Sequence, residues 1–123
     1  MMTFTIYGET PSKKNSRINT RNGRSFPSKR YKMWHDDAIM QIAAFFDGKI
    51  PIMPNDKKNK VSVIFYHGDL RDRDSDNQLT SILDMLKDAG VIKDDTWKII
   101  KRGSFDNEYD KGNARCVVSL EIL

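Results

Sequence analysis

Cysteine and histidine are scarce in this sequence. Cys116 is the sole cysteine, so no internal disulfide is possible, which excludes disulfide-stapled secreted domains and indicates a reducing, intracellular home. The two histidines, His35 and His67, lie far apart along the chain. With one cysteine they are too few and too scattered to predict a zinc site.

Long apolar runs are absent as well. No stretch approaches the roughly 20 apolar residues that a membrane-spanning helix needs, and 1-MMTFTIYGET-10 lacks the basic-then-apolar order of a secretory signal. The composition is otherwise ordinary for a globular protein, with 38% hydrophobic and 31% charged residues. A chain of 123 residues then predicts one domain, residues 1–123, with one modest core. We expect a cytoplasmic protein.

Acidic residues are missing from one long stretch, Pro11 to Lys32, which holds eight basic residues and carries +8. The whole chain has 21 basic and 17 acidic residues, so the remainder has 13 basic and 17 acidic residues and carries −4. The eight basic residues are Lys13, Lys14, Arg17, Arg21, Arg24, Lys29, Arg30 and Lys32. Such a separated positive charge is typical of proteins that bind a polyanion, whereas the plainer interpretation is a solvated basic loop without a partner.

Hydropathy patterns in the first half of the chain predict a strand and a helix separated by a long loop. Alternation over residues 3–7 indicates a short strand, and glycines and prolines punctuate a loop over residues 8–28. Ser28 is a suitable N-cap for a helix over about residues 29–46. Its apolar residues recur at helical spacing: Tyr31, Trp34, Ala38, Ile42 and Phe45. That spacing favours core packing of the aromatic residues over base stacking.

The second half predicts three strands and a helix. After a polar loop, residues 61–66 are β-branched and apolar on both faces, which indicates a central strand. The helix that follows ends at Gly90, and its apolar face consists of Leu79, Ile82, Leu83 and Leu86. Strands are expected at 97–102 and at 115–123, and the last has an alternating apolar face of Cys116, Val118, Leu120 and Ile122. The order β-α-β-α-β-β predicts an α+β fold, a small mixed sheet of about four strands covered by two helices.

Three aspartates occupy alternate positions in 71-RDRDSDNQ-78, just before the second helix. They are Asp72, Asp74 and Asp76, and a further pair, 94-DD-95, follows that helix. A helix N-cap and the helix dipole account for one or two of these carboxylates, but not for all of them. An antiparallel return of the chain after the helix would bring the second pair beside the first, and converging carboxylates suit a hard cation such as Mg²⁺ or Mn²⁺.

The spacing excludes a calcium-binding EF-hand loop. Counted from Asp72, the sixth position is Asn77 and the twelfth is Leu83. An EF-hand requires glycine and a bidentate glutamate at those two positions. The aspartates therefore predict a different kind of metal site.

Several segments around these aspartates form a recognisable series. A D-x-D-N motif at a helix start, 74-DSDN-77, is followed by the helix 78-QLTSILDMLKDAG-90 and the turn 91-VIKDD-95. Earlier in the chain stand 10-TPSKKNSR-17 and 26-FPSKRYKMW-34. Together these segments resemble the RusA-like endodeoxyribonucleases, Holliday junction resolvases common in phages and prophages. The resemblance covers most of the chain and is most specific in the acidic motifs and the helix between them.

The resemblance implies a site, a cofactor and a partner. It assigns Asp74, Asp76 and Asp95 as catalytic metal ligands, with Asp94 and Asp72 in supporting positions. The implied cofactor is Mg²⁺, with Mn²⁺ as a substitute. The implied substrate is branched DNA, a four-way junction, and the implied assembly is a homodimer in the cytoplasm of a bacterial or phage-infected cell.

One position departs from the family pattern. The family usually has a lysine one helical turn after its second aspartate, where this sequence has Thr80. Thr80 stays a supporting candidate, but a hydroxyl supplies no positive charge, so another cation must substitute or the activity is weak. Lys93 and Lys13 or Lys14 are candidates for this cation. Lys87 lies about 16 Å from Asp76 along the helix and is too far from the site.

The basic stretch would hold the DNA backbone, which an acidic site alone repels. The expected contacts are Lys13, Lys14, Asn15, Arg17, Lys29 and Arg30. A metal-bound water removes the need for a histidine base. His67, which follows the central strand, is therefore interpreted as a structural or surface histidine.

These features favour a metal-dependent DNA endonuclease that hydrolyses phosphodiester bonds. Its selectivity for Holliday junctions, in recombination and repair, is what the resemblance implies. An alternative is a junction- or DNA-binding protein of the same fold with weakened catalysis, for which Thr80 is the main argument. A third interpretation is a small nucleic-acid-binding or regulatory module in which the aspartates only cap a helix.

Overall fold

The computed structural model describes residues 1–12, 17–19, 21–23 and 25–123, with the side chains of 17–19 and 25–27 outside the description. Within these residues there are two helices and six strands. In chain order they are β1 (Met2–Tyr7), β2 (Arg17–Asn19), β3 (Ser25–Pro27), α1 (Lys29–Phe45), β4 (Asn59–His67), α2 (Ser75–Asp88), β5 (Ile100–Tyr109) and β6 (Arg115–Ile122).

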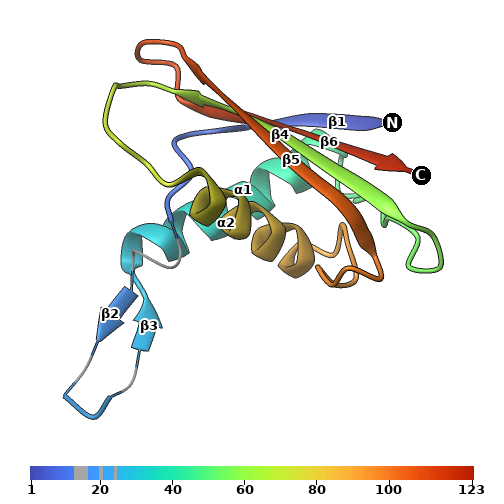
Figure 1. Ribbon diagram of the computed structural model, residues 1–123, viewed down its shortest axis with the longest axis horizontal. Coiled ribbons are helices and arrows are strands. Elements are labelled where there is room, and N and C mark those ends of the chain that lie inside the picture. The colour runs from blue at the N-terminus through green and yellow to red at the C-terminus, as the bar shows by residue number, and fades with distance from the viewer. Residues whose placement is uncertain (13–16, 20, 24) are drawn as a thin grey trace.

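Four of the described strands form one mixed sheet in the order β1-β6-β4-β5. Strand β6 is antiparallel to both β1 and β4, and β5 is parallel to β4. Strands β1, β4 and β5 therefore end at the same edge of the sheet. Figure 1 shows both helices on one face of this sheet, which confirms the predicted α+β fold with a mixed sheet and two helices.

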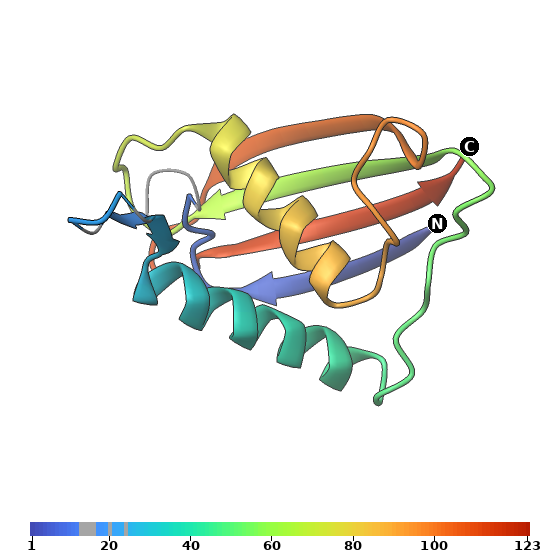
Figure 2. The same cartoon turned by 90° about the horizontal axis from the view of Figure 1, so that it is seen from below.

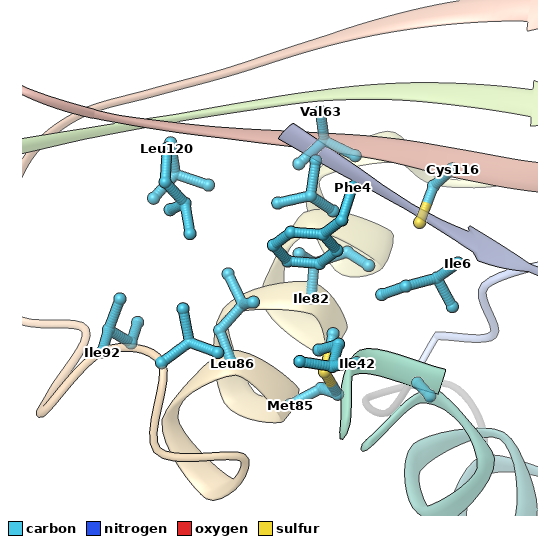
Figure 3. Close-up of a cluster of buried hydrophobic side chains, with 14 of the residues drawn as sticks. Phe4, Ile6, Ile42, Val63, Ile82, Met85, Leu86, Ile92, Cys116 and Leu120 are labelled. Atoms are coloured by element: carbon cyan, nitrogen blue, oxygen red, sulfur yellow. The ribbon is translucent and has the colours of Figure 1, made fainter. Parts of the chain in front are cut away.

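The hydrophobic core lies between the sheet and helix α2. Ile82 and Leu86 of α2 point toward Phe4, Val63 and Leu120 of the strands (Figure 3), and all five side chains are at most 2% exposed. Burying each aliphatic side chain of this size stabilises the fold by about 1.5–3 kcal/mol. The core therefore holds α2 in a fixed position across the sheet.

Helix α1 begins as its sequence predicts. Ser28 is the N-cap, and its Oγ accepts a hydrogen bond from the Tyr31 backbone N–H at 3.1 Å. The aromatic residues Tyr31 and Trp34 are buried, which confirms that they belong to the core. Phe45 was expected on the same face, but it is 58% exposed because it lies in the last turn, where its ring makes an edge-to-face contact with Phe46.

The prediction for the central strand was half right. Strand β4 is central, between β6 and β5, but its burial alternates: Val61, Val63 and Phe65 are buried, whereas Ile64 and Tyr66 are only half-buried. The reason is that both helices cover the same face of the sheet. The apolar run therefore predicted a strand at the right position, but it wrongly predicted that both faces of that strand are buried.

Three further details differ from the prediction: a strand boundary, the exposure of one residue and an additional hairpin. The expected strand over 97–102 begins at Ile100 instead and continues to Tyr109, because a turn closes before it with the Ile99 N–H on the Thr96 carbonyl at 3.0 Å. Ile122 is 53% exposed rather than part of the core face, since it lies at the end of β6. The loop predicted over 8–28 contains a short antiparallel hairpin, β2–β3, seen in Figure 1.

The β4–α2–β5 crossover places the two ends of α2 at opposite edges of the sheet. Strand β4 ends where α2 begins, and β5 begins after α2 has ended (Figure 2). The start of α2 therefore lies beside the carboxyl ends of the parallel strands. In the part of the chain that the structure describes, neither helix is long and apolar enough to cross a membrane.

Candidate functional site

The first two aspartates of the predicted metal site stand at the start of α2. Asp74 occupies the N-cap position with extended backbone angles, but its side chain makes no capping hydrogen bond. Its Oδ2 instead accepts from the Asn77 side-chain amide at 3.3 Å. Asp76 lies in the first helical turn and is exposed. The positive end of the helix dipole stabilises both carboxylates. Asp74 occupies the N-cap position, but its carboxylate makes no hydrogen bond to the backbone of the first turn.

A cleft of about 410 Å³ lies beside Asp74. It is bounded by residues 10–12, which follow β1, by the first turn of α1, by the β4–α2 connection and by the start of α2. Its lining residues are Thr10, Pro11, Ser12, Arg30, Arg71, Asp72, Arg73, Asp74 and Gln78. The cleft therefore lies beyond the carboxyl ends of β1 and β4, the edge at which α/β sheets commonly bind ligands.

Hydrogen bonds from α2 fix one wall of the cleft. Gln78 is 1% exposed, and its Nε2 donates to the Thr10 carbonyl at 2.7 Å. One turn later, the Ser81 hydroxyl donates to the Pro11 carbonyl, also at 2.7 Å. Residues 10 and 11 after β1 are thus attached to the same helix that carries Asp74 and Asp76, so this wall and the carboxylates keep their relative positions.

A partly buried ion-pair network adjoins the cleft at Arg73. The Arg73 guanidinium contacts Asp69 at 2.9 Å and Glu9 at 3.3 Å, and the Arg73 and Glu9 side chains are each 15% exposed. The hydrogen bond from Arg73 holds the pKa of Asp69 at about 2, well below its ordinary range. Arg73 is therefore compensated by two carboxylates of its own chain and braces the β4–α2 connection.

His67 belongs to this same network, as the structural interpretation predicts. Its Nδ1 lies 3.0 Å from a Glu9 carboxylate oxygen, and its Nε2 lies 2.8 Å from the Asn107 side-chain oxygen. Asn107 in turn donates to the Ser75 hydroxyl at 2.9 Å, which joins β5 to the first residue of α2. His67 thus positions the start of α2, and both of its ring nitrogens are engaged.

The second aspartate pair lies at the other end of α2. Asp94 and Asp95 follow the helix, with the Asp94 carboxylate accepting from the Asp95 backbone N–H at 2.8 Å. Helix α2 has 14 residues, so its length alone separates the pairs by about 20 Å. Shortly after them, the Ile99 carbonyl accepts from the N–H of Asn59, the first residue of β4. The expected antiparallel return does not bring the pairs together within one chain.

The structure also places the residues discussed as supporting cations. The Thr80 hydroxyl donates to the Asp76 carbonyl at 3.0 Å, so it is turned onto its own helix. Lys87 lies in the last turn of α2, and Lys93 lies beyond it beside the second aspartate pair. Neither lysine is near the cleft of its own chain.

The predicted DNA contacts are only partly described. Lys29 and Arg30 are exposed in the first turn of α1, and Arg30 lines the cleft. Lys13, Lys14 and Asn15 lie outside the described residues. Arg17 begins strand β2, and its side chain lies outside the description. The basic residue that the sequence analysis missed is Arg71, because only the folded connection brings it to the cleft.

A second acidic group was not expected. His35, Asp84 and Asp88 each offer an atom able to bind a metal ion, and these atoms all lie within 4.8 Å of one another. His35 Nε2 lies 2.8 Å from Asp88, and the buried Tyr31 hydroxyl donates to Asp84 at 2.6 Å. Burial and the hydrogen bond to Asp84 raise the pKa of Tyr31, which keeps it a donor. The i, i+4 spacing of the aspartates was readable from the sequence, but the facing His35 required the helix packing.

Comparison with known proteins gives one informative match. No family model matches the chain. Over 83 residues the chain is 32% identical to the crossover junction endodeoxyribonuclease RusA of Aquifex aeolicus (strain VF5). The match covers 68% of this chain and 63% of that relative, slightly less than two thirds of its length. This match, together with the D-x-D-N motif at the start of α2, supports the resemblance of the chain to the RusA-like family.

Proposed function

We propose that this protein is a Mg²⁺-dependent DNA endonuclease that hydrolyses phosphodiester bonds at four-way junctions in the cytoplasm, in recombination or repair. One observation carries the proposal: Asp74 lies on a cleft shared with arginines, and its carboxylate does not cap the helix. A carboxylate that only capped α2 would accept from a backbone N–H of the first turn. The similarity to a crossover junction endodeoxyribonuclease supplies the substrate class.

The residues at the start of α2 fit a hard divalent cation. Mg²⁺ prefers oxygen ligands and is commonly bound by one or two carboxylates together with waters and phosphate oxygens. Asp74 and Asp76 provide two such carboxylates on one rigid helix start. Bound there, Mg²⁺ or Mn²⁺ would supply a water of lowered pKa and a Lewis acid for the phosphate.

The chain's own residues then bind and orient the DNA. Arg30 holds a phosphate of the backbone at the cleft and Lys29 holds one nearby. The further phosphate contacts that we propose are Lys13, Lys14, Asn15 and Arg17. His67 does not act as a base in this scheme, because Glu9 and Asn107 occupy its nitrogens. Its role is to hold the start of α2 against the sheet.

We propose further that Asp95 completes the site of a second subunit. In a two-fold dimer, antiparallel packing of α2 against its partner's α2 places the carboxyl end of one helix beside the amino end of the other. Leu79 and Leu83 of α2 are only partly buried, so this helix retains apolar surface that a partner would cover. Asp94 and Lys93 would arrive with Asp95. Such a homodimer has two composite sites, one for each of two symmetric junction strands.

The proposal is tested by cleavage of a labelled synthetic four-way junction. Linear duplex, single-stranded and flap DNA serve as competing substrates, with Mg²⁺ and then Mn²⁺, and Asp76→Asn is the active-site variant. We expect paired symmetric nicks in the junction that the variant does not make. Cleavage of all four substrates at similar rates would refute the junction selectivity, and cleavage that survives in Asp76→Asn would refute the site.

The second candidate function is a junction-binding protein with weakened catalysis. The observation that favours it is Thr80, whose hydroxyl is bonded to the Asp76 carbonyl and brings no positive charge to the site. Tight binding of the junction without cleavage in either metal would support this candidate. In that case Thr80→Lys is expected to restore cleavage.

A further inference from the structure

We infer that the edge of the sheet where β4 and β5 begin is a second nucleic-acid surface, which holds single-stranded DNA on lysines and stacks one of its bases on Trp97. Within one chain, the nine residues of β4 separate this edge from the cleft by about 25 Å. In the proposed dimer the surface would lie nearer to the partner's cleft, since Trp97 follows Asp95 by two residues. The inference goes beyond the proposed function and does not depend on it.

The fold brings together two basic segments that lie 40 residues apart in the sequence. Strands β4 and β5 are parallel and begin beside each other (Figure 1). Asn59, at the start of β4, is 0% exposed and joins the two segments. Its backbone N–H and its side-chain amide both donate to the Ile99 carbonyl, at 2.9 and 3.1 Å. The basic residues gathered at this edge are Lys57, Lys58, Lys60, Lys98, Lys101 and Arg102.

The positive charge of this edge is not neutralised by ion pairs. Among the described residues, the ion pairs lie elsewhere, and none joins one of these six side chains to a carboxylate. Positive charge stays in excess even when every neighbouring acidic residue is counted. A surplus of exposed cations attracts a polyanion. The acidic neighbours are Asp56, Asp94, Asp95 and Glu121.

An exposed aromatic ring lies among these lysines. Trp97 is 74% exposed, although its large apolar surface would favour burial. The Lys58 ammonium lies 4.8 Å from the centre of the Trp97 ring and donates to the Lys98 carbonyl at 3.2 Å. The cation and the indole are therefore held next to each other at the surface, and most of the indole stays accessible.

The combination of lysines and an exposed indole fits an unpaired strand. Proteins that bind single strands hold the phosphates on basic side chains and stack bases on aromatic rings. In a duplex, neighbouring base pairs cover the faces of each base, so an indole finds no free face within it. An acidic peptide would match the charge of the lysines but would offer no base to Trp97.

Tryptophan fluorescence tests the inference without metal or catalysis. The chain has two tryptophans, of which Trp97 is 74% exposed and Trp34 is 9% exposed. An oligodeoxythymidine of about eight nucleotides is titrated into the metal-free protein at low salt. We expect saturable quenching in the wild type and none in Trp97→Phe, in which Trp34 alone remains. A strand of the same length without bases should bind about fivefold more weakly or worse, and it should leave the fluorescence unchanged.

Lysine variants locate the phosphate contacts. Lys98→Gln and Lys101→Gln should each raise the midpoint of the quenching titration and reduce its dependence on salt, by about 0.7 in the slope of log K against log salt. The matched control is Lys111→Gln, an exposed lysine in the turn between β5 and β6 at the opposite edge of the sheet, which should change neither quantity.

Three results would overturn the inference. They are equal quenching by the strand without bases or by linear duplex, equal quenching by an acidic peptide of matched charge, and unchanged midpoints in both lysine variants. The acidic-peptide result would assign the surface to an acidic protein instead. Because no cleavage is measured, failure of this inference and failure of the proposed function are separate results.

Discussion

The two ends of helix α2 are both acidic, yet they are compensated in different ways. At the amino end, Asp74 and Asp76 face the positive end of the helix dipole, and Asp74 lines a cleft with arginines. At the carboxyl end, Asp84 and Asp88 lie where the dipole disfavours negative charge. There the protein supplies direct partners, with Tyr31 on Asp84 at 2.6 Å and a His35 nitrogen 2.8 Å from Asp88.

The difference shows that acidity alone does not mark a catalytic site. Carboxylates at the carboxyl end are engaged by side chains of α1, and they tie the two helices together. Asp76 at the amino end is exposed, and Asp74, two residues before it, lines a cleft of about 410 Å³. The structural group at the carboxyl end has fixed partners within the protein, whereas the candidate site at the amino end adjoins a cleft with exposed cations. This difference distinguishes the two groups.

Matched substitutions at the two ends give the largest expected contrast. Asp76→Asn should lower junction cleavage by about 10³-fold or more, as the loss of a catalytic group does, while Asp88→Asn should leave it within a few-fold. Cleavage rates with Mg²⁺ under single-turnover conditions measure both. Equal losses in the two variants would show that the ends are not functionally distinct.

Metal affinity extends this contrast. Calorimetric titration with Mn²⁺ should show weakened binding in Asp76→Asn and unchanged binding in Asp88→Asn. The opposite pattern would place the ion at the group formed by His35, Asp84 and Asp88, and would remove the metal from the proposed catalytic site.

The hydrogen bonds that hold the cleft wall give the next effect. Gln78→Met should lower the free energy of unfolding by about 1–3 kcal/mol, because the Thr10 carbonyl loses its buried donor. It should also lower cleavage, since the segment at Thr10 loses this bond to α2. Urea denaturation with parallel cleavage assays checks both, and a destabilised variant with full activity would show that the wall is not part of the site.

The structural contact at the carboxyl end predicts a smaller effect without loss of function. Tyr31→Phe removes the hydroxyl that donates to Asp84 at 2.6 Å, at a cost of about 1 kcal/mol. Urea denaturation should detect this change, and cleavage should remain at the wild-type rate. A marked loss of cleavage in Tyr31→Phe would contradict the purely structural role of the carboxyl end of α2.

The smallest effect concerns the pH dependence of stability. The pKa of Asp69 is about 2 in the fold, below its ordinary value near 3.8, because Arg73 donates to it. Its stabilising contribution is therefore full above about pH 4 and is lost as the pH falls through about 2. The difference in Tm between the wild type and Asp69→Asn should be constant from pH 7 to 5 and shrink below pH 4. A difference that persists at pH 2 would contradict the Asp69–Arg73 pairing.

Local patterns predicted the elements, but not how their ends meet. Helical and strand periodicities gave the order of the main elements and put Asp74 at a helix start, since capping and amphipathicity act over a few residues. They did not give the single covered face of the sheet, because that depends on where both helices pack. They also misplaced Asp95. Because β4 and β5 are parallel, the chain after Gly90 continues to the start of β5, away from Asp74 and Asp76, and does not turn back toward them.

The central claim is that one complete site draws Asp76 from one subunit and Asp95 from the other, and subunit mixing tests it most directly. Asp76→Asn and Asp95→Asn are each expected to be inactive alone on a four-way junction. After exchange in equal amounts, half of the dimers are mixed and hold one intact composite site, so about a quarter of the wild-type number of sites should return, with single nicks. No recovered nicking after exchange is verified, or full activity of Asp95→Asn alone, would contradict the account.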